Sequence, residues 1–364
     1  MDGWGDVSGA TRERGGATPN AWTLGPFTDS LSAMRVARLH GKADLRLHEE
    51  DRPRPGPGEV LVRVGAVGVC GSDIHWFVDG GIDSVRVARP FVPGHEFGGA
   101  TEDGRRVAID PAIPCGACRP CVEGDVNLCD SIRFAGDGRH DGGLGEWVAW
   151  PERCLIPLPD PLTETDGAML EPLGVAIHAV DLGHVRSGSS VGVFGCGPIG
   201  LLVLQVARLA GARLFATDLE SRPHRLAAAR ALGAQVFAAT DGGEGGAVRD
   251  AAGRGGLDTA FEAAGEQGAV DAAIEAVRPG ARVVLAGIPT DSRTSFAAGT
   301  ARRKGLTIVI SRRMGHVYPR AVQLVAGGHV DVRSLVTHRF PLAEVGAAFD
   351  AAVNRVGHKV VIEP

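Results

Sequence analysis

The chain has 364 residues, 44% of them hydrophobic, and a formal net charge of -5. This length suggests two domains with enough apolar side chains for two cores, and the small negative charge argues against a nucleic-acid or anionic-membrane partner. No apolar run is long enough to cross a bilayer and the N-terminus lacks a signal-peptide pattern, so we expect a cytoplasmic protein.

Residues 1–33 contain Gly, Thr, Ser, Asn and Pro with little periodicity, which predicts a disordered N-terminal extension. As an alternative, the large side chains of Trp4, Trp22 and Phe27 could hold part of this arm on the protein surface. The packed chain is expected to begin near Met34.

The residues from Met34 onward predict a β-rich domain built of short strands and turns. The run 52–58 holds three prolines and two glycines and interrupts the pattern. Strands are predicted at Met34–Leu39, Leu45–His48, Glu59–Val67, Val107–Pro111 and Trp147–Pro151. The cysteines and histidines of this domain fall in its predicted loops.

Four residues of this region are widely spaced but share a chemistry: Cys70, His95, Glu96 and Glu171. A thiolate, an imidazole and a carboxylate supply three protein ligands and leave a position for water or substrate, as a catalytic zinc requires. Each also has a simpler interpretation, as a buried thiol, a core histidine or, for Glu171 before Pro172, an acid at a helix N-terminus. The separations of these residues in the sequence do not by themselves show that they come together in space.

Four further cysteines lie close together in the chain: Cys115, Cys118, Cys121 and Cys129. Their spacing, in a chain without a signal-peptide pattern, indicates metal binding and not disulfide bonds. Four thiolates can surround one tetrahedral zinc and leave no position open for a reactant, so we predict a structural zinc that folds a lobe. An iron–sulfur cluster could use the same ligands, but nothing else in the sequence indicates electron transfer.

A dinucleotide-binding turn is predicted at residues 191–200, where a short β-branched run meets three glycines and a helical pattern begins. Gly195, Gly197 and Gly200 match G-x-G-x-x-G, in which glycine allows a tight turn, a close pyrophosphate and close helix–strand packing. The unpaired N–H groups of the following helix favour phosphate. Pro198 and Ile199, inside the turn, complete its predicted cofactor contacts.

An acidic residue ends the next predicted strand. Asp218 stands where a carboxylate accepts hydrogen bonds from the adenosine ribose, which favours NAD because a carboxylate repels the 2′-phosphate of NADP. Arg222, a further predicted cofactor contact, and Arg225 could soften that repulsion. The sequence therefore predicts NAD, with strict or dual cofactor use left open.

Strands alternate with helices from about residue 183, which predicts a doubly wound parallel sheet with right-handed crossovers. The expected strands are Ser190–Phe194, Leu214–Asp218, Gln235–Ala239, Asp258–Glu262, Ala281–Ala286 and Leu306–Ser311. The expected helices include Arg222–Leu232 and Gly268–Val277 and, later, Pro319–Ala326 and Leu342–Val353. Turns are expected at the glycine-rich runs Asp241–Gly246 and Gly253–Gly256, and a last strand, Lys359–Glu363, is expected to return to the β-rich domain.

Several motifs occur together in one order: Cys70-Gly-Ser-Asp-Ile-His75, Gly94-His-Glu96, the four-cysteine loop, Glu171-Pro172 and the nucleotide turn. In this order they resemble the zinc-dependent medium-chain dehydrogenase/reductase superfamily. Glu171, in place of the cysteine of ordinary alcohol dehydrogenases, with the segments 171–179 and 337–342, looks most like the polyol (sorbitol, xylitol, L-iditol) dehydrogenases. The resemblance implies an α/β protein with a GroES-like β-rich catalytic domain (residues 34–182 and 317–364), a Rossmann NAD-binding domain (residues 183–316) and two zinc ions.

The resemblance also implies roles at the catalytic zinc. Cys70, His95 and Glu96 would bind the ion, and Glu171 would either ligate it or hold a zinc-bound water. Ser72 would bond the substrate oxygen and pass its proton towards the ribose and His75. A histidine suits that relay, although a loop histidine bonded to the backbone remains an equal alternative for His75.

Two residues are expected near the substrate, and one strand near a second subunit. Trp76 stands at the aromatic position after the first ligand motif, and Arg313 could bond substrate hydroxyls or be a surface cation. Met314 follows Arg313 where the polyol enzymes often have Tyr, so the substrate could be a cyclic or secondary-metabolite polyol. Residues 306–311 would pair with another subunit in a homodimer or homotetramer.

The predicted function is a zinc-dependent oxidoreductase that transfers hydride between NAD and a polyol or other secondary alcohol, with a small alcohol or ketone as its only expected ligand besides the cofactors. Enzyme alternatives are an amino-alcohol dehydrogenase, such as one acting on threonine, and a cyclic-ketose reductase. From another class, the chain could be a nucleotide-binding protein that has lost catalysis.

Overall fold

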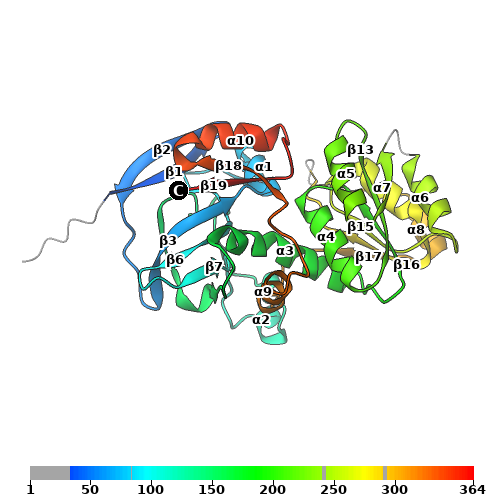
Figure 1. Cartoon of the computed structure of the whole chain (residues 1–364), viewed down its shortest axis with the longest axis horizontal. Helices are drawn as coiled ribbons and strands as arrows, with labels where there is room; N and C mark the ends of the chain where they lie inside the picture. The colour runs from blue at the N-terminus through cyan, green and yellow to red at the C-terminus, as the bar shows by residue number, and fades with distance from the viewer. Residues whose placement is uncertain (1–32, 83, 240–242, 290–292) are drawn as a thin grey trace, which may run out of the picture. The chain divides into compact units, whose positions relative to one another are not determined.

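The computed structural model describes residues 33–364 except residues 83, 240–242 and 290–292 (Figure 1). The residues Ala33–Pro364 form one compact unit. The predicted N-terminal extension, with Trp4, Trp22 and Phe27, lies outside the described residues except for Ala33. Ala33 belongs to the first strand, β1 (Ala33–Gly41), so the extension ends one residue earlier than predicted.

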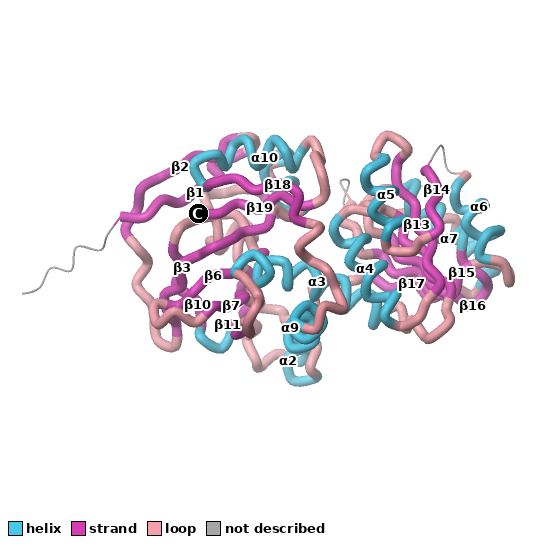
Figure 2. The backbone as a smooth tube through the Cα atoms, in the orientation of Figure 1, coloured by secondary structure: helices cyan, strands magenta, loops and turns pink. Residues whose placement is uncertain are grey.

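A two-stranded hairpin and a seven-stranded sheet form the β-rich part of the chain (Figure 2). The hairpin joins β1 to β2 (Asp44–Asp51). The sheet has the order β11-β7-β6-β3-β19-β18, with β10 paired to β3. Its strands are β3 (Glu59–Gly68), β6 (Glu96–Thr101), β7 (Arg106–Ile109), β10 (Trp147–Pro151), β11 (Leu155–Pro157), β18 (Val336–Pro341) and β19 (Lys359–Glu363). β19 pairs antiparallel with β3. This confirms the prediction that the last strand returns to the β-rich domain.

Short elements connect these strands and carry most of the polar motifs. The helices are α1 (Gly71–Asp79), α2 (Arg119–Glu123), α9 (Tyr318–Ala326) and α10 (Val345–Val353), and the short strands are β4 (Gly81–Ile82), β5 (Val85–Arg86), β8 (Ala112–Ile113) and β9 (Arg133–Phe134). Single 3-10 turns lie at Val126–Leu128, Glu152–Cys154 and Leu342–Glu344. The predicted helix Leu342–Val353 therefore begins as a 3-10 turn.

A six-stranded parallel sheet has the order β14-β13-β12-β15-β16-β17, which confirms the predicted doubly wound arrangement. Its strands are β12 (Ser190–Phe194), β13 (Arg213–Leu219), β14 (Gln235–Ala239), β15 (Leu257–Glu262), β16 (Val277–Leu285) and β17 (Thr307–Ile310). The helices between them are α4 (Pro198–Leu209), α5 (Pro223–Ala231), α6 (Glu244–Ala252), α7 (Gln267–Ala276) and α8 (Ala298–Lys304). The chain order changes direction at β12, and ligands of such sheets bind at the carboxyl ends of the strands beside that point.

The sequence predicts a turn at the glycine-rich run Asp241–Gly246. Residues 241 and 242 lie outside the described residues, but Glu244–Gly246 form the first turn of α6, so a turn there is wrong. Gly253 ends α6 with a positive φ of 64°, and the predicted turn at Gly253–Gly256 is confirmed.

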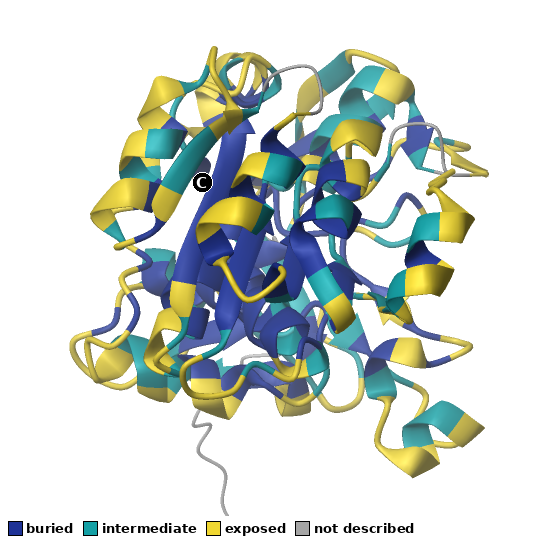
Figure 3. Cartoon of the chain, turned by 90° about the vertical axis from the view of Figure 1, so that its right-hand side faces the viewer, coloured by how far each residue is buried: buried dark blue, intermediate teal, exposed yellow. Residues whose placement is uncertain are grey.

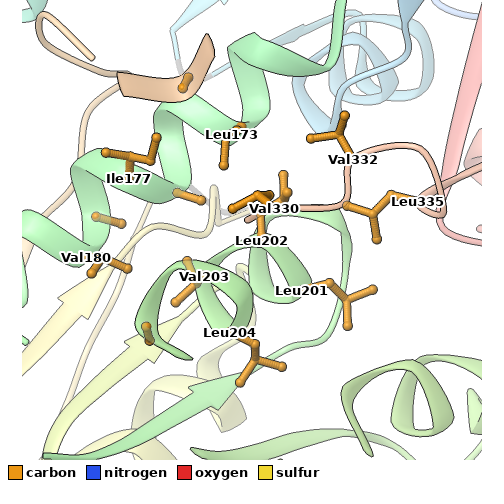
Figure 4. Close-up of a cluster of buried hydrophobic side chains, with 14 of the residues drawn as sticks. Leu173, Ile177, Val180, Leu201, Leu202, Val203, Leu204, Val330, Val332 and Leu335 are labelled. Carbon is orange, nitrogen blue, oxygen red and sulfur yellow. The ribbon is translucent and has the colours of Figure 1, made fainter. Parts of the chain in front are cut away.

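Helix α3 (Glu164–Leu182) is the main element that the sequence patterns did not predict. Thr163 caps it: the Thr163 Oγ1 accepts the Asp166 N–H at 3.2 Å, and the Asp166 Oδ2 accepts the Thr163 N–H at 2.8 Å. The helix packs on β3, β6 and β7 and also on α4 and α9. Figure 4 shows its apolar side chains Leu173, Ile177 and Val180 beside those of α4. Since both faces of α3 are buried, its sequence has little amphipathic period.

The central parallel strands β12, β13 and β15 are buried, whereas the edge strands β14 and β17 are half-buried or exposed, as are the outer helix faces (Figure 3). This burial explains why the central strands are continuous apolar runs in the sequence. None of the described helices is long and apolar enough to span a membrane.

Candidate functional site

Three of the residues predicted to bind the catalytic zinc come together. One donor atom each of Cys70, His95 and Glu96 lies within 4.8 Å of the other two. Cys70 is the N-cap of α1, His95 precedes β6, and Glu96 is the first residue of β6. A thiol, an imidazole and a carboxylate at these separations match the donor types and number of a catalytic zinc site.

The pairing of strands explains this convergence. In the sheet, Gly68 at the end of β3 lies opposite Glu96 on β6 and opposite Val361 on β19. Cys70 follows Gly68 by two residues and Lys359 precedes Val361 by two, so both side chains start beside Glu96. A Cβ atom at Gly68 would lie 2.2 Å from the Glu96 Oε2, and only glycine leaves room for that carboxylate.

Burial changes the acid–base chemistry of the site. Burial and, to a smaller extent, the Glu96 carboxylate raise the pKa of the Cys70 thiol to about 12, although Lys359 opposes them. A cysteine ligand must lose its proton, and a bound cation stabilises the thiolate that results. The donor set therefore fits a zinc ion, whose positive charge would stabilise the Cys70 thiolate.

Asp73, which the sequence analysis did not single out, holds two of these residues in place. It is 1% exposed, and its Oδ2 accepts the Cys70 N–H at 2.9 Å. Its Oδ1 accepts the Gly94 N–H at 3.1 Å and lies 3.7 Å from the His95 Nδ1. Carboxylates behind a ligating histidine orient its ring. The signal in the sequence that could have identified Asp73 is its position inside the Cys70–His75 motif.

Lys359 is a second residue that sequence reasoning missed. Its Nζ donates to the Glu96 Oε1 at 2.7 Å and to the Val69 carbonyl oxygen at 3.2 Å, and it is 3% exposed. Burial alone would lower the pKa of Lys359, but the charges of Glu96 and Cys70 raise it, so the amine stays protonated. Because Lys359 lies far away in the chain and looks like an ordinary strand residue, no sequence pattern links it to Glu96.

Glu171 lies near this group but outside the compact set of three. It is 4% exposed in the middle of α3, with Pro172 next to it inside the helix, so the interpretation as a helix N-terminal acid is wrong. Burial raises the pKa of Glu171 to about 8, His95 lowers it, and Glu96 and Cys70 raise it. The charges of His95, Glu96 and Cys70 thus act on its carboxylate, and its direct or water-mediated role at the zinc stays a prediction.

The residues predicted to move the proton both lie on α1. The Ser72 Oγ is 3.5 Å from the His95 Nε2. The His75 Nδ1 lies 2.8 Å from the Asp79 Oδ2, one helical turn later. The alternative of a loop histidine bonded to the backbone is therefore wrong: His75 is helical and pairs with a carboxylate.

Arg313 is not the surface cation that one interpretation predicts. Its guanidinium carbon lies 3.8 Å from the centre of the Phe134 ring, and that ring is 5.3 Å from the His95 ring. Burial and the charge of Arg312 lower the pKa of Arg313 to about 10. Its Nη1 is buried without a hydrogen-bond partner among the described residues. The Asn127 Nδ2 donates to the Arg312 carbonyl at 3.0 Å and fixes this segment.

Trp76 lies in a hydrophobic cluster with Leu39 and Phe91. It is 4% exposed, and its ring meets Phe91 edge to face with the centroids 5.4 Å apart. The described contacts of Trp76 are thus apolar packing, and a contact with substrate stays a prediction.

The four-cysteine lobe also brings its donors together. One sulfur atom each of Cys115, Cys118, Cys121 and Cys129 lies within 4.8 Å of the others. Backbone N–H groups of Ala117 and Cys118 donate to the Cys115 sulfur at 3.5 and 3.3 Å, and they lower the pKa of Cys115 to about 6. Amide donors directed at a sulfur stabilise a thiolate, so this donor set fits a tetrahedral zinc.

Replacing Cys118 with serine is expected to lower the melting temperature or the yield of soluble protein before it changes the chemistry, because zinc binding at such a lobe is coupled to its folding. Thermal unfolding, zinc content per chain and the KM of the remaining folded enzyme should be measured together. Cys154→Ser is the matched control, since Cys154 is buried outside both cysteine groups. A Cys118→Ser enzyme that is fully stable but inactive would contradict the structural role.

The predicted nucleotide turn lies between β12 and α4. Gly195 has a φ of 103°, and a Cβ at Gly200 would lie 1.9 Å from the Gly195 carbonyl oxygen. A Cβ at Gly197 would come near only the Arg225 Nη1, at 3.8 Å. Pro198 and Ile199 are the first two residues of α4, and Gly197 is its N-cap. The turn therefore has the room and the unpaired N–H groups that a pyrophosphate needs.

Asp218 is the last residue but one of β13 and lies beside this turn. Its Oδ2 accepts the Cys196 N–H at 2.8 Å, its Oδ1 accepts the Leu219 N–H at 2.7 Å, and it is 7% exposed. Arg222 is the N-cap of α5, and the Arg225 Nη1 is 3.9 Å from the Asp218 Oδ2. Each carboxylate oxygen keeps a lone pair for a ribose hydroxyl, so the predicted diol contact fits this placement.

Comparisons with known proteins show the family of the chain. Residues 198–327 match the family zinc-binding dehydrogenase, and residues 56–160 match the alcohol dehydrogenase GroES-like domain. The chain is 30% identical to the sorbitol dehydrogenase of Bacillus subtilis over 333 residues, which cover 88% of this chain and 94% of that protein. It is 36% identical to the probable D-xylulose reductase A of Emericella nidulans over 337 residues, 87% of this chain and 93% of the relative.

A solved alcohol dehydrogenase of Escherichia coli CFT073, complexed with NADH, has a similar fold. Its TM-score is 0.83 at 26% identity, and the match covers 92% of this chain and all of that one. The order of the motifs, the two sheets and the relatives that match most of the chain all indicate the same family. The chain belongs to the zinc-dependent medium-chain dehydrogenases, and it is an alcohol oxidoreductase whose cofactors are NAD and zinc.

Proposed function

We propose that the enzyme transfers hydride between NAD and a polyol, or another secondary alcohol, at a zinc held by Cys70, His95 and Glu96. The convergence of these three donors within 4.8 Å carries the proposal. The relatives named sorbitol dehydrogenase and D-xylulose reductase support the substrate class. The four-cysteine lobe holds the second zinc, away from the chemistry.

The cofactors supply the reactive chemistry: zinc is a Lewis acid for the substrate oxygen, and NAD accepts the hydride. The chain's own residues move the proton. Ser72 Oγ bonds the substrate oxygen and passes the proton to the Nε2 of His75. Since Asp79 accepts from the Nδ1 side of that ring at 2.8 Å, Nε2 is the nitrogen left to receive it. Glu171, which is not one of these three donors, either ligates the zinc or holds a zinc-bound water.

Arg313 binds hydroxyl groups of the substrate in this proposal, because its buried Nη1 has no hydrogen-bond partner among the described residues. Replacing it with leucine is expected to raise KM for a polyol about tenfold or more, with a smaller change in kcat, since a hydrogen bond from a charged donor is lost. Arg312→Leu, at the exposed neighbouring residue, is the control. Equal KM values for Arg313→Leu and wild type would remove Arg313 from the site.

The proposal is tested by following the absorbance of reduced nicotinamide with polyols, aminocyclitols, amino alcohols and cyclic ketones. Turnover of polyols with the highest kcat/KM supports it. Preference for threonine-like amino alcohols or for cyclic ketones would favour the alternative enzymes. No turnover of any alcohol by a zinc-loaded preparation would favour a nucleotide-binding protein without catalysis, although the complete donor set speaks against that alternative.

We also propose the domain boundaries 34–182 with 317–364 and 183–316, a cytoplasmic location, and a homodimer or homotetramer without nucleic-acid or membrane partners. Strand β17 is the last strand in the order of its sheet, and Ile310 at its end is 76% exposed. An open strand edge of this kind pairs readily with a second copy. The mass of the enzyme in solution tests the assembly.

A further inference from the structure

A buried carboxylate holds the loop that follows strand β15. Glu262 is the last residue of that strand and is 2% exposed. Its Oε1 accepts the backbone N–H groups of Ala264 and Gly265, each at 2.7 Å. The first residues after the strand are thus fixed by its own last side chain.

The loop that follows β16 is held by the same residue. The Glu262 carbonyl oxygen accepts the N–H groups of Ala286 and Gly287 at 2.8 and 3.1 Å. A Cβ atom at Gly287 would lie 2.6 Å from the Glu262 Oε2 and 2.2 Å from the Gly265 nitrogen, and a Cβ atom at Gly265 would lie 2.3 Å from the Ile288 carbonyl oxygen. The two loops therefore touch along their backbones. We call residues 263–266 and 286–288 the paired loops.

The carboxylate and the paired loops stabilise each other. Burial raises the pKa of Glu262, and the backbone N–H groups of Ala264, Gly265, Glu266 and Gly287 oppose this by lowering it. Hydrogen bonds to a charged acceptor are stronger than those between neutral groups, and a buried charge that loses its donors is costly. Moving either loop would take donors from the carboxylate, so Glu262 fixes the position of both.

The paired loops lie beside the nucleotide turn. The Ala263 N–H donates to the Phe194 carbonyl oxygen at 2.8 Å. A Cβ atom at Gly195, the first glycine of the turn, would lie 2.8 Å from the Cβ and from the nitrogen of Ala264. Both loops follow the carboxyl ends of their strands, which is the edge where a sheet of this kind binds its ligands.

The direction of the cofactor follows from the order of the strands. A dinucleotide lies across the point at which the strand order reverses, with one half on each side. That point is β12, with β13 on one side and β15 and β16 on the other. Asp218, the acid predicted to bind the adenosine ribose, belongs to β13. The nicotinamide half must then extend towards β15 and β16, where the paired loops lie.

We propose that Glu262 is a positioning residue for the nicotinamide half of the cofactor, because its carboxylate holds the paired loops in the shape against which the ring is placed for hydride transfer. The buried side chain acts through the backbone of the loops and not by contact with the ring. The inference rests on the NAD site of the proposed function, and not on the zinc site or on the identity of the alcohol.

The test compares the whole cofactor with its adenosine half on the full-length enzyme. NADH binding is followed by the fluorescence of the reduced nicotinamide, and ADP binding by calorimetry. Glu262→Gln keeps the size of the side chain but replaces one acceptor oxygen with an NH2 donor, which faces backbone N–H groups. It is expected to weaken NADH about tenfold or more, since a hydrogen bond to a charged group is lost. The affinity for ADP should not change, because the nucleotide turn and Asp218 are intact.

Asp258→Asn is the matched control. Asp258 is also an acid of β15, but it lies near the amino end of the strand, where its Oδ2 accepts the Ser190 N–H and its Oδ1 accepts the Arg278 Nε–H, each at 2.8 Å. A purely structural loss can lower the stability of both variants, but only Glu262→Gln should change the ratio of NADH affinity to ADP affinity.

A second variant keeps the test decisive if Glu262→Gln fails to fold. Gly287→Ala places a methyl group against Gly265 and the Glu262 carboxylate, and should also weaken NADH and not ADP. Equal losses of NADH and ADP affinity in a folded variant, or an unchanged NADH affinity, overturn the proposal. A wild-type enzyme that binds neither nucleotide would contradict the NAD site itself, and the positioning role with it.

Discussion

Replacing Cys70 with serine is expected to lower kcat/KM for the alcohol by more than about 100-fold while NADH binding persists. Loss of even an outer partner of a metal ligand costs about 10–100-fold in metal affinity or activity, and Cys70 is proposed as a ligand itself. A serine hydroxyl is a poor replacement, since it does not ionise as a thiol does and is a harder donor. Nucleotide binding should remain because the turn at Gly195–Gly200 belongs to the other sheet.

Three measurements on the same preparation make this prediction sharp: kcat/KM, zinc per chain and NADH affinity. The Cys70→Ser enzyme should lose about one zinc of two, and Cys154→Ser should keep both, because Cys154 lies outside both groups of donors. Parallel loss of NADH binding and turnover would contradict two separate sites. Unchanged turnover would remove Cys70 from the zinc.

Replacing Lys359 with methionine is expected to lower the free energy of unfolding by about 3–5 kcal/mol, because it leaves the buried Glu96 carboxylate without its ammonium partner. The Lys359 Nζ is 2.7 Å from the Glu96 Oε1 and 2.5 Å from its Oε2, and the side chains are 3% and 1% exposed. Lys359 also satisfies the Val69 carbonyl, which would lose its donor at 3.2 Å. Urea unfolding at a fixed zinc concentration measures the change.

Lys42→Met is the matched control for Lys359→Met, since Lys42 is exposed and should change stability by less than about 0.5 kcal/mol. The double variant Glu96→Gln with Lys359→Met removes both charges and should be more stable than the sum of the two single changes predicts. A loss below about 1 kcal/mol for Lys359→Met, or strictly additive effects, would mean that the buried pair does not couple.

Some of the fold follows directly from short stretches of sequence. The strands Ser190–Phe194 and Gln235–Ala239 have the predicted bounds. The first is buried throughout, and a buried parallel strand is a continuous apolar run between turns. Helix α3 is different: it is buried on both faces and has no clear helical period, and Pro172 inside it imitates a helix boundary. This is why the sequence allows the alternative that Glu171 stands at a helix N-terminus, which the structure shows to be wrong.

The sequence by itself determined which donors the chain carries and in what order: a thiol, an imidazole and carboxylates, four clustered cysteines, and a glycine turn before a helix. Those motifs are local, because a few residues of backbone decide whether neighbouring cysteines or glycines can surround one ligand.

Tertiary structure alone decided what surrounds each donor. Pairing of β3 with both β6 and β19 brings Lys359 to Glu96, and the segment at Arg313 reaches Phe134 beside His95. The segment at His358 likewise reaches His224 beside the nucleotide turn. Contacts between residues so far apart in the chain depend on strand register and on the packing of whole elements, and neither leaves a local pattern in the sequence.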